Sequence, residues 1–534
     1  MKLTLEGIKS SEWKDKGYIV PDFNYDEVKK NTFDNPLWVH FGAGNIFRAF
    51  QANVVQELLN KGVLKQGLIV AEGYDYEIIQ KMYAPHDNIS ALVTLKSSGK
   101  VDKTVVASIM EALTCNPEDA KDWNRLLDIF NKPSLQMVTF TITEKGYLLK
   151  NASGVSMPGV DEDFASGPSK PLSYIGKIAS LLYHRFTNGR LPLAVVSMDN
   201  CSHNGDKIRN AVITFAEEWE KRGVCDKGFA AYLKDESKIT FPWTMIDKIT
   251  PRPDKKIEEL LLKDGVEGLE SVITSKKTYV APFVNAEECQ YLVIEDKFPN
   301  GRPELEKAGI YFTDRTTVEK VEKMKVCTCL NPLHTALAVS GCLLGYTLIA
   351  DEMKDKDLVN MINTLGYKEG LPVVVDPGII SPKKFIDEVV NIRIPNPFMP
   401  DTPQRIACDT SQKLSIRFGE TIKGYQKRQD LDVKSLKVIP FVFALWMRYL
   451  MAIDDTGTKF DLSPDPLLEE VCRYVGGIEL GKDFDAHEVC RDLLKREDIF
   501  GVNLYEAGLG DKVESYFKLL CKEKGAVRNA VRSL

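Results

Sequence analysis

The sequence predicts an α/β protein whose N-terminal domain contains a mostly parallel sheet and whose C-terminal domain is mainly α-helical. Two observations support this prediction. In the first half of the chain, short apolar segments of β type alternate with helix-period segments, which is typical of a parallel sheet. Beyond the middle of the chain the patterns are mainly helical, with helices expected at 332–349, 352–364, 381–391, 402–424, 436–454, 465–474, 486–495 and 510–523.

The composition is that of a globular protein of two or three domains. The chain has 534 residues, of which 44% are hydrophobic and 27% charged. The net charge of −6 is not concentrated in blocks, which argues against nucleic acid or an anionic membrane as a partner. The eleven cysteines are an odd number and are scattered, and no signal-peptide pattern opens the chain. We therefore expect reduced thiols in a cytoplasmic protein.

The first apolar strand, 37–41, opens the predicted domain after a polar extension, 1–35, that we expect on the surface. The strand runs into Gly42-Ala-Gly44 and then into a helix-period segment. Strand, Gly-x-Gly turn and amphipathic helix form the beginning of a Rossmann-type dinucleotide-binding domain, where glycines let the backbone approach a pyrophosphate. Phe47 stands where the third glycine of this fingerprint usually lies. The predicted cofactor-binding residues of this turn are Gly42, Gly44, Asn45, Ile46, Phe47 and Arg48.

Two acidic residues follow the second apolar strand, 68–71. Glu72 ends this strand and Asp75 follows closely. An acid in this place binds the ribose hydroxyls in many dinucleotide-binding proteins, although here it lies further from the glycines than the ~20 residues that are usual. Such an acid would repel a 2′-phosphate, so we expect NAD rather than NADP. The alternative is that both acids belong to a solvated turn.

Polar clusters also follow the apolar strands at 137–143 and 192–198. In parallel sheets, ligands bind beyond the carboxyl ends of the strands, where these clusters lie. Asp199 and Asn200 are therefore candidates for a site, although both residue types are also common in turns. Asp247 lies further on, in a loop bounded by prolines. We expect a Rossmann-type domain over residues 36–285 and a helical domain over 286–534.

One stretch of the second half, Lys325–His334, carries a lysine, an asparagine and a histidine. Asn331 followed by Pro332 predicts a helix start, with Asn331 as N-cap and Pro332 as the first helical residue. His334 would lie in the first turn, where the helix dipole disfavours its protonated form. A lysine with such neighbours suits acid–base catalysis if its pKa is lowered. The alternative is a capped core helix preceded by an unrelated lysine.

A further predicted helix start, Asp401-Thr-Pro403, precedes two cations. Arg405 and Lys413 are spaced by about two helical turns, so they share a face if the helix is continuous. Two cations on one face are most often solvated. The histidines are few and not clustered, and we expect no metal site.

Several stretches together resemble the mannitol dehydrogenase family, the polyol-specific long-chain dehydrogenases and reductases. They follow the family's order: His40–Ala49, Thr143–Tyr147, Ser197–Asn200, Met245–Pro251, Val293–Asp296, Asn331–His334 and Asp401–Lys413. The resemblance implies a Rossmann-type domain that binds NAD(P), a mostly helical substrate domain, and a reaction without metal.

The resemblance also implies roles for individual residues. Lys325 corresponds to the general acid/base, and Asn200 and Asn331 to the amides that polarise the reacting oxygen. The groups that hold substrate hydroxyls or a terminal group correspond to His334, Asp247, Arg405 and Lys413.

Two departures from the family pattern affect the stretch around Lys325. This lysine is one residue further from Asn331 than in the family, which a one-residue bulge would compensate, and Lys323 is a second candidate. The family's Asn-Gly-x-His is here Asn-Pro-Leu-His. The second departure concerns the substrate specificity.

These observations predict a metal-independent, NAD-dependent oxidoreductase that interconverts a secondary alcohol and a ketone on an open-chain sugar acid or polyol. We expect the pair D-mannonate and D-fructuronate, as for a fructuronate reductase, because Arg405 and Lys413 suit a carboxylate. The alternatives are a mannitol 2-dehydrogenase acting on mannitol and fructose, a tagaturonate reductase, and a non-catalytic NAD-binding sensor. The expected partner is a small molecule, and neither nucleic acid nor a membrane.

Overall fold

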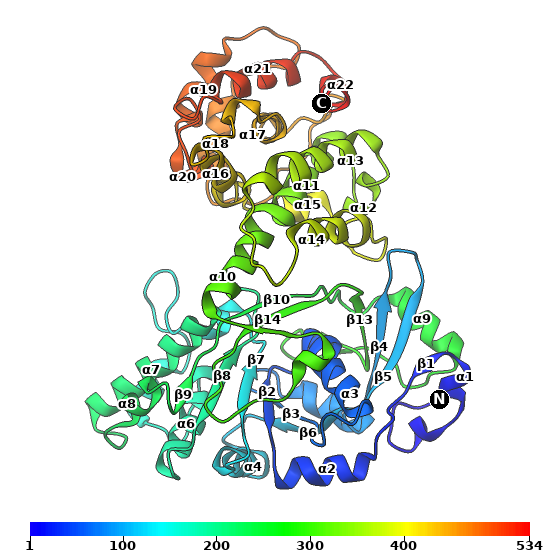
Figure 1. Cartoon of the computed structure of the whole chain (residues 1–534), viewed down its shortest axis with the longest axis vertical. Coiled ribbons are helices and arrows are strands. Elements are labelled where there is room, and N and C mark those ends of the chain that lie inside the picture. The colour runs from blue at the N-terminus through cyan, green and yellow to red at the C-terminus, as the bar shows by residue number, and fades with distance from the viewer. The chain divides into compact units, whose positions relative to one another are not determined.

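A computed structural model describes residues 1–534, which form two compact units (Figure 1). Unit 1 contains residues 1–95 and 100–319, and unit 2 contains residues 96–99 and 320–534. The boundary expected at 285/286 falls inside strand β13 (Phe283–Glu287). Unit 1 extends beyond it because β14 (Tyr291–Glu295) pairs with β10 (Thr244–Asp247), and β15 (Tyr311–Thr313) pairs with β14.

The main sheet of unit 1 has six strands, all parallel, in the order β6-β3-β2-β7-β8-β9 (Figure 1). The chain order reverses between β2 and β7, at the topological switch point where dinucleotides bind in doubly wound sheets. The predicted Rossmann-type fold is therefore confirmed. The strands are β2 (Trp38–Phe41), β3 (Leu68–Glu72), β6 (Ile109–Thr114), β7 (Met137–Phe140), β8 (Leu193–Ser197) and β9 (Ile239–Thr240).

Both faces of this sheet are covered, because successive side chains of a strand point to opposite faces. Val39 and Phe41 belong to one buried core, which also contains side chains of α4, α6, α7 and α8. Trp38 belongs to the core on the other side, with side chains of α3. Burial on both faces explains why the strands are continuously apolar. The helices are α3 (Ala52–Asn60), α4 (Ala120–Asn131), α6 (Tyr174–Thr187), α7 (Asn204–Arg222) and α8 (Phe229–Lys234).

The N-terminal residues are part of the fold and do not lie on its surface as an extension. Trp13 is completely buried, and β1 (Tyr18–Ile19) pairs with β5 (Val101–Val106) at the edge of a second sheet, β1-β5-β4-β13. The sequence prediction was wrong here because the apolar residues of this segment are too few to show a period. The remaining elements of unit 1 are α1 (Glu12–Asp15), α2 (Tyr25–Asp34), β4 (Ser90–Leu95), α5 (Val160–Ser166), α9 (Lys255–Asp264), β11 (Val272–Ile273) and β12 (Tyr279–Val280).

Unit 2 is built from helices, as predicted. Its central helix, α17 (Val438–Leu450), has every residue buried and packs against α11 (Asn331–Leu344) and α21 (Gly510–Leu520). Helix α10 (Arg315–Met324) leads into this unit. The others are α12 (Ile349–Glu352), α13 (Lys356–Asn363), α14 (Pro382–Glu388), α15 (Pro403–Ile406), α16 (Glu420–Gln426), α18 (Leu468–Val475), α19 (Ala486–Leu494), α20 (Glu497–Phe500) and α22 (Ala526–Arg532).

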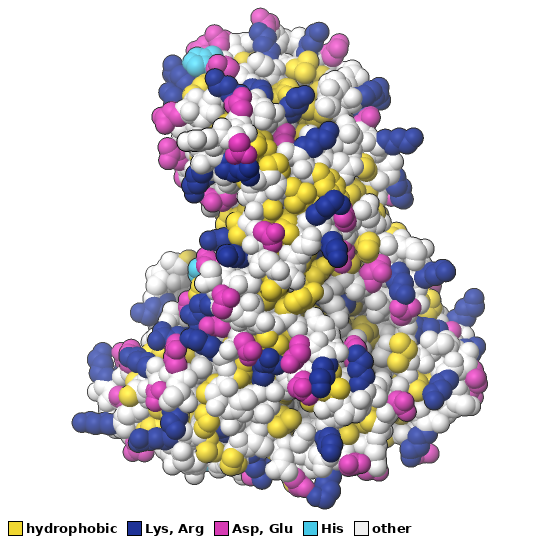
Figure 2. Space-filling model, viewed as in Figure 1, with side chains coloured by type: hydrophobic (Ala, Val, Ile, Leu, Met, Phe, Trp, Pro, Cys, Tyr) yellow, Lys and Arg dark blue, Asp and Glu magenta, His cyan; other side chains and the backbone are white.

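The helical run Arg315–Leu344 is long and apolar enough to cross a membrane, but 78% of its apolar window is buried inside the protein. Burial of this kind is expected for a core helix. On the face shown in Figure 2, acidic and basic side chains are interspersed and no large patch of one sign forms. This distribution agrees with the small net charge of −6.

Candidate active site

The glycine-rich turn after β2 lies at the switch point of the main sheet. Gly42 has φ +112°, and a Cβ there would lie 2.4 Å from the carbonyl oxygen of Thr141, so only glycine fits. A Cβ on Gly44 would meet no atom within 4 Å. Gly44, Asn45 and Ile46 are half-buried. The backbone at Gly44 is therefore open, as the close approach of a pyrophosphate requires.

The residues that follow this turn point into the protein. Phe47 is fully buried and stacks on His40, with 4.2 Å between the ring centroids. Arg48 is also fully buried, and it donates hydrogen bonds to the side chain of Asn45 at 2.9 Å and to the carbonyl of Ala281 at 2.8 Å. Phe47 and Arg48 thus support the turn from inside the protein.

The Glu72 carboxylate links the turn to the end of the neighbouring strand. One oxygen accepts from the backbone N–H of Ala43 at 2.9 Å, and the other from the N–H groups of Tyr74 and Asp75 at 2.8 and 3.1 Å. Asp75 is almost fully buried and accepts from the Thr274 hydroxyl at 2.6 Å. Neither acid lies in a solvated turn.

A cavity of about 850 Å³ opens between these two strand ends. Its size is within the range of small-molecule and cofactor sites. Lys177, on α6, donates to the carbonyl of Gly73 at 3.0 Å and to the Tyr76 hydroxyl at 2.6 Å, and burial lowers the pKa of Lys177. The wall also includes Lys276, from the hairpin β11–β12. Among the residues that line the cavity are Gly42, Gly44, Glu72, Tyr74, Asp75, Thr141, Lys145, Tyr174, Lys177 and Lys276.

The ends of β7 and β8 are joined through Asp199. Its carboxylate accepts from the backbone N–H groups of Ile142 and Thr143 at 3.0 and 2.9 Å, and from the Tyr147 hydroxyl at 2.5 Å. Burial raises the pKa of Asp199, and these hydrogen bonds oppose that shift. Asp199 therefore fixes the backbone that carries the next residue, Asn200.

Asn204, which the sequence did not single out, connects β8 to β10. Its amide donates to the Thr244 hydroxyl at 2.8 Å, and that hydroxyl donates to the carbonyl of Ser197 at 2.7 Å. Asp247, at the other end of β10, is 7% exposed. These bonds fix the start of β10 beside the end of β8, the strand that precedes Asn200.

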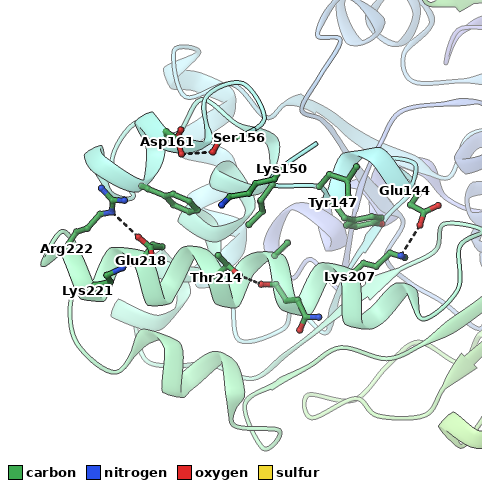
Figure 3. Close-up of a pocket in the computed structure, with 15 residues that line it drawn as sticks. Glu144, Tyr147, Lys150, Ser156, Asp161, Lys207, Thr214, Glu218, Lys221 and Arg222 are labelled. Carbon is green, nitrogen blue, oxygen red and sulfur yellow. Dashed lines mark hydrogen bonds and ion pairs between the residues drawn. The ribbon is translucent and has the colours of Figure 1, made fainter. Parts of the chain in front are cut away.

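A second cavity in unit 1, of about 730 Å³, lies along α7 (Figure 3). Lys207 pairs with Glu144 at 2.9 Å, and Arg222 pairs with Glu218 at 3.2 Å. Because these charges neutralise each other, we assign no ligand to this cavity.

In unit 2, Lys325 begins a π-helical turn, Lys325–Cys329, that continues helix α10. A π-helical turn contains one residue more than the α-helical turn it replaces, and such turns are frequent at functional sites. The extra residue between Lys325 and Asn331 is accommodated in this way. Lys325 is 3% exposed. Helix α11 begins one residue earlier than expected, with Leu330 as N-cap and Asn331 inside the first turn.

His334 lies in the first turn of α11 beside a carboxylate. Its Nε2 atom is 3.7 Å from the Asp401 carboxylate, which also pairs with Arg405. Burial lowers the pKa of His334 to about 4, against the opposing effect of Asp401, and the charges of Arg393, Arg417 and Arg405 lower it further. His334 is therefore neutral at pH 7.

The continuous helix expected over 402–424 does not form. Helix α15 ends at Ile406, and Asp409 adopts a left-handed conformation with φ 53°. The Lys413 amine donates to the carbonyl of Ile406, at 3.3 Å, and to that of Cys408. Because the helix is interrupted, these carbonyls are available to a side-chain donor. The predicted helix was wrong in its continuity, and the condition under which Arg405 and Lys413 would share a helical face is therefore not met.

A further cation, Arg417, contacts the N-terminal part of α11. It lies in the π-helical turn Ser415–Gly419, and its Nη1 atom donates to the Thr335 hydroxyl and, at 3.5 Å, to the Asn331 carbonyl. No sequence pattern indicated Arg417, because its partners lie far away along the chain. Unit 2 thus brings together Asn331, His334, Asp401, Arg405, Lys413 and Arg417.

A parallel sheet in Rossmann order, with an open glycine-rich turn at its switch point, defines a dinucleotide-binding protein. The chain matches the mannitol dehydrogenase Rossmann domain over residues 37–307 and the mannitol dehydrogenase C-terminal domain over residues 317–520. The protein belongs to the mannitol dehydrogenase family.

Individual relatives resemble the chain over its whole length. It is 53% identical to the D-mannonate oxidoreductase of Thermotoga maritima, covering 100% of this chain and 99% of the relative. The solved mannitol 2-dehydrogenase of Pseudomonas fluorescens, a ternary complex with NAD and D-mannitol, is 25% identical with a TM-score of 0.68, covering 100% and 99% of the two chains. A substrate-free D-sorbitol dehydrogenase is 25% identical with a TM-score of 0.77, covering 96% and 97%.

Proposed function

We propose that the protein is an NAD-dependent oxidoreductase that interconverts D-mannonate and D-fructuronate. The observation that carries this proposal is its similarity over the full length to a D-mannonate oxidoreductase. The cluster of cations in unit 2 supports an acidic substrate, since charge-assisted hydrogen bonds to a carboxylate are stronger than those to a hydroxyl.

The cavity of unit 1 fits a dinucleotide. Its open backbone at Gly44 accommodates a pyrophosphate, and the Glu72 carboxylate at the end of β3 favours NAD over a cofactor with a 2′-phosphate. Bound NAD supplies the acceptor for the hydride of the alcohol, and NADH returns it to the ketone.

Lys325 is the general acid/base of this proposal. Alcohol oxidation requires a group that removes the hydroxyl proton, and ketone reduction requires the same group to return it. The side-chain amides of Asn200 and Asn331 donate to the oxygen as negative charge develops on it. His334, neutral at pH 7, and Asp247 bind substrate hydroxyls.

We further propose that the protein works in the cytoplasm. All eleven cysteines are free thiols, which is typical of a reducing compartment.

The test is NADH oxidation, followed by absorbance, with D-fructuronate, D-tagaturonate and D-fructose as separate substrates. We expect the highest kcat/KM with D-fructuronate. A preference for D-fructose or D-tagaturonate would make the protein a mannitol 2-dehydrogenase or a tagaturonate reductase. No turnover with any ketone, together with intact NADH binding, would support a sensor.

A further inference from the structure

Three cations follow the start of α15 in unit 2, and two of them are already engaged. Arg405 pairs with Asp401, and Lys413 donates to the carbonyls of Ile406 and Cys408. The third cation, Arg417, forms no ion pair with an acid. Its guanidinium thus holds a charge without a counter-charge.

The position of Arg417 is fixed by the residues of the proposed site. Nη1 donates to the Thr335 hydroxyl and to the Asn331 carbonyl, both near the N-terminus of α11. Nε and Nη2 make no hydrogen bond within the structure. This pair of donors on one edge of a guanidinium is suited to bidentate binding of a carboxylate.

The charge of Arg417 also acts on its neighbours. Burial and then Arg417 lower the pKa of Lys413, and Arg417 is among the cations that lower the pKa of His334. Burial lowers the pKa of Arg417 itself to about 10. Keeping a half-buried cation close to other cations costs free energy unless an anion neutralises it.

We infer that Arg417 binds the carboxylate of the substrate and makes the protein select a sugar acid over a neutral polyol. This inference rests on the proposed function and deepens it. Arg405 and Lys413, which the sequence suggested for the carboxylate, are engaged by Asp401 and by backbone carbonyls respectively. A polyol places a hydroxymethyl group beside Arg417 and leaves the charge without a partner, so binding is weaker.

The test compares matched ligands that differ only in this group. D-fructuronate and D-fructose serve as substrates, and D-mannonate and D-mannitol as ligands in thermal-shift binding. Arg417→Met should lower kcat/KM for D-fructuronate by about 10²-fold, mainly through KM, and should lower kcat/KM for D-fructose by a much smaller factor. The stabilisation by D-mannonate should disappear, whereas Kd for NADH should not change.

Two further variants control for folding and for charge. Arg417→Lys keeps the charge without the planar fork, and we expect an intermediate loss. Arg428→Met removes an exposed cation of the same unit, which pairs with Asp430, and should leave both substrates unaffected.

Several outcomes would overturn the inference. An equal loss of D-fructuronate and D-fructose turnover in Arg417→Met would mean that Arg417 only supports α11. Unchanged D-fructuronate turnover would mean that the carboxylate binds elsewhere, while the proposed function would stand. If the wild-type protein neither reduces D-fructuronate nor is stabilised by D-mannonate, the proposed function and this inference both fail.

Discussion

The Glu72 carboxylate at the end of β3 accepts a hydrogen bond from the backbone N–H of Ala43, 2.9 Å away in the glycine-rich turn. The same carboxylate holds the N–H groups of Tyr74 and Asp75. One side chain therefore fixes both loops that border the proposed cofactor cavity. Its hydrogen bonds hold the loops of the cavity, and its negative charge would repel the 2′-phosphate of NADP.

Glu72→Gln should weaken NADH binding and reduce the preference for NADH over NADPH. A glutamine oxygen can accept only part of these hydrogen bonds, and the charge that repels a 2′-phosphate is lost. We expect Kd for NADH to rise about tenfold, which corresponds to about 1.4 kcal/mol, while Kd for NADPH falls or stays constant. Fluorescence titration measures both constants. Glu57→Gln, on the exposed face of α3, is the control. Equal affinity of the wild-type protein for both cofactors would contradict this role of Glu72.

Lys325→Ala should lower kcat by about 10²–10⁴, the range typical of a positioned acid or base. NADH binding should persist, because the cofactor cavity lies within unit 1. Lys323 is exposed, in contrast to the buried Lys325, so Lys323→Ala should be nearly silent. Steady-state kinetics of both variants show which of the two lysines is catalytic. A loss confined to Lys323→Ala would place the catalytic lysine two residues earlier, and two active variants would refute the role of this stretch.

The pH profile of kcat/KM should show no inflection near pH 6.5 from His334. Burial lowers the pKa of His334 to about 4 from its ordinary value of 6.5, so the ring stays neutral from pH 5 to 9 and becomes charged only as the pH falls towards 4. Rate profiles of the wild-type protein and of His334→Asn test this expectation. An inflection near pH 6.5 that disappears in His334→Asn would show that the charged form takes part.

Glu352 on α12 should make the protein less stable as the pH rises. It is fully buried, neither carboxylate oxygen has a hydrogen-bond partner, and burial followed by the charge of Asp355 raises its pKa well above 4.5. The folded state then keeps a proton that the unfolded chain releases above pH 4.5. Stability therefore falls with rising pH from there until the folded pKa is passed, at about 1.4 kcal/mol per pH unit.

Glu352→Gln removes this dependence, so its melting temperature should exceed that of the wild-type protein by a margin that grows with pH. Thermal unfolding at several pH values between 4 and 9 measures the margin. Glu469→Gln, at an exposed ion pair, should leave the slope unchanged. A constant difference between Glu352→Gln and the wild-type protein would contradict the raised pKa.

Exhaustive chelation should leave kcat and KM unchanged. In the proposed mechanism a lysine transfers the proton and two amides polarise the oxygen, and no group of three or more His, Cys, Asp or Glu side chains is arranged to hold a metal ion. Loss of activity on chelation, with recovery on adding Zn²⁺, would contradict this prediction.

The sequence by itself determined the two-part architecture, because local periodicity reports which side chains are buried. The continuously apolar strands around Gly42 and the helical patterns beyond residue 332 required no knowledge of distant contacts. The ordered family motifs added the candidate lysine and the two asparagines. The odd spacing of Lys325 was also visible, but only the structure shows that a π-helical turn accommodates it.

Tertiary structure decided the features that depend on hydrogen bonds between distant residues. Asp75 meets Thr274, 199 residues away, and Arg417 meets Thr335, 82 residues away. No local pattern encodes such pairs, because neither partner changes the periodicity around it. The break in the helix after Ile406 has the same origin, since the Lys413 amine stabilises carbonyls that a regular helix would have used itself. Our inference that Arg417 binds the carboxylate depends on this break, because Lys413 is engaged by the carbonyls of Ile406 and Cys408.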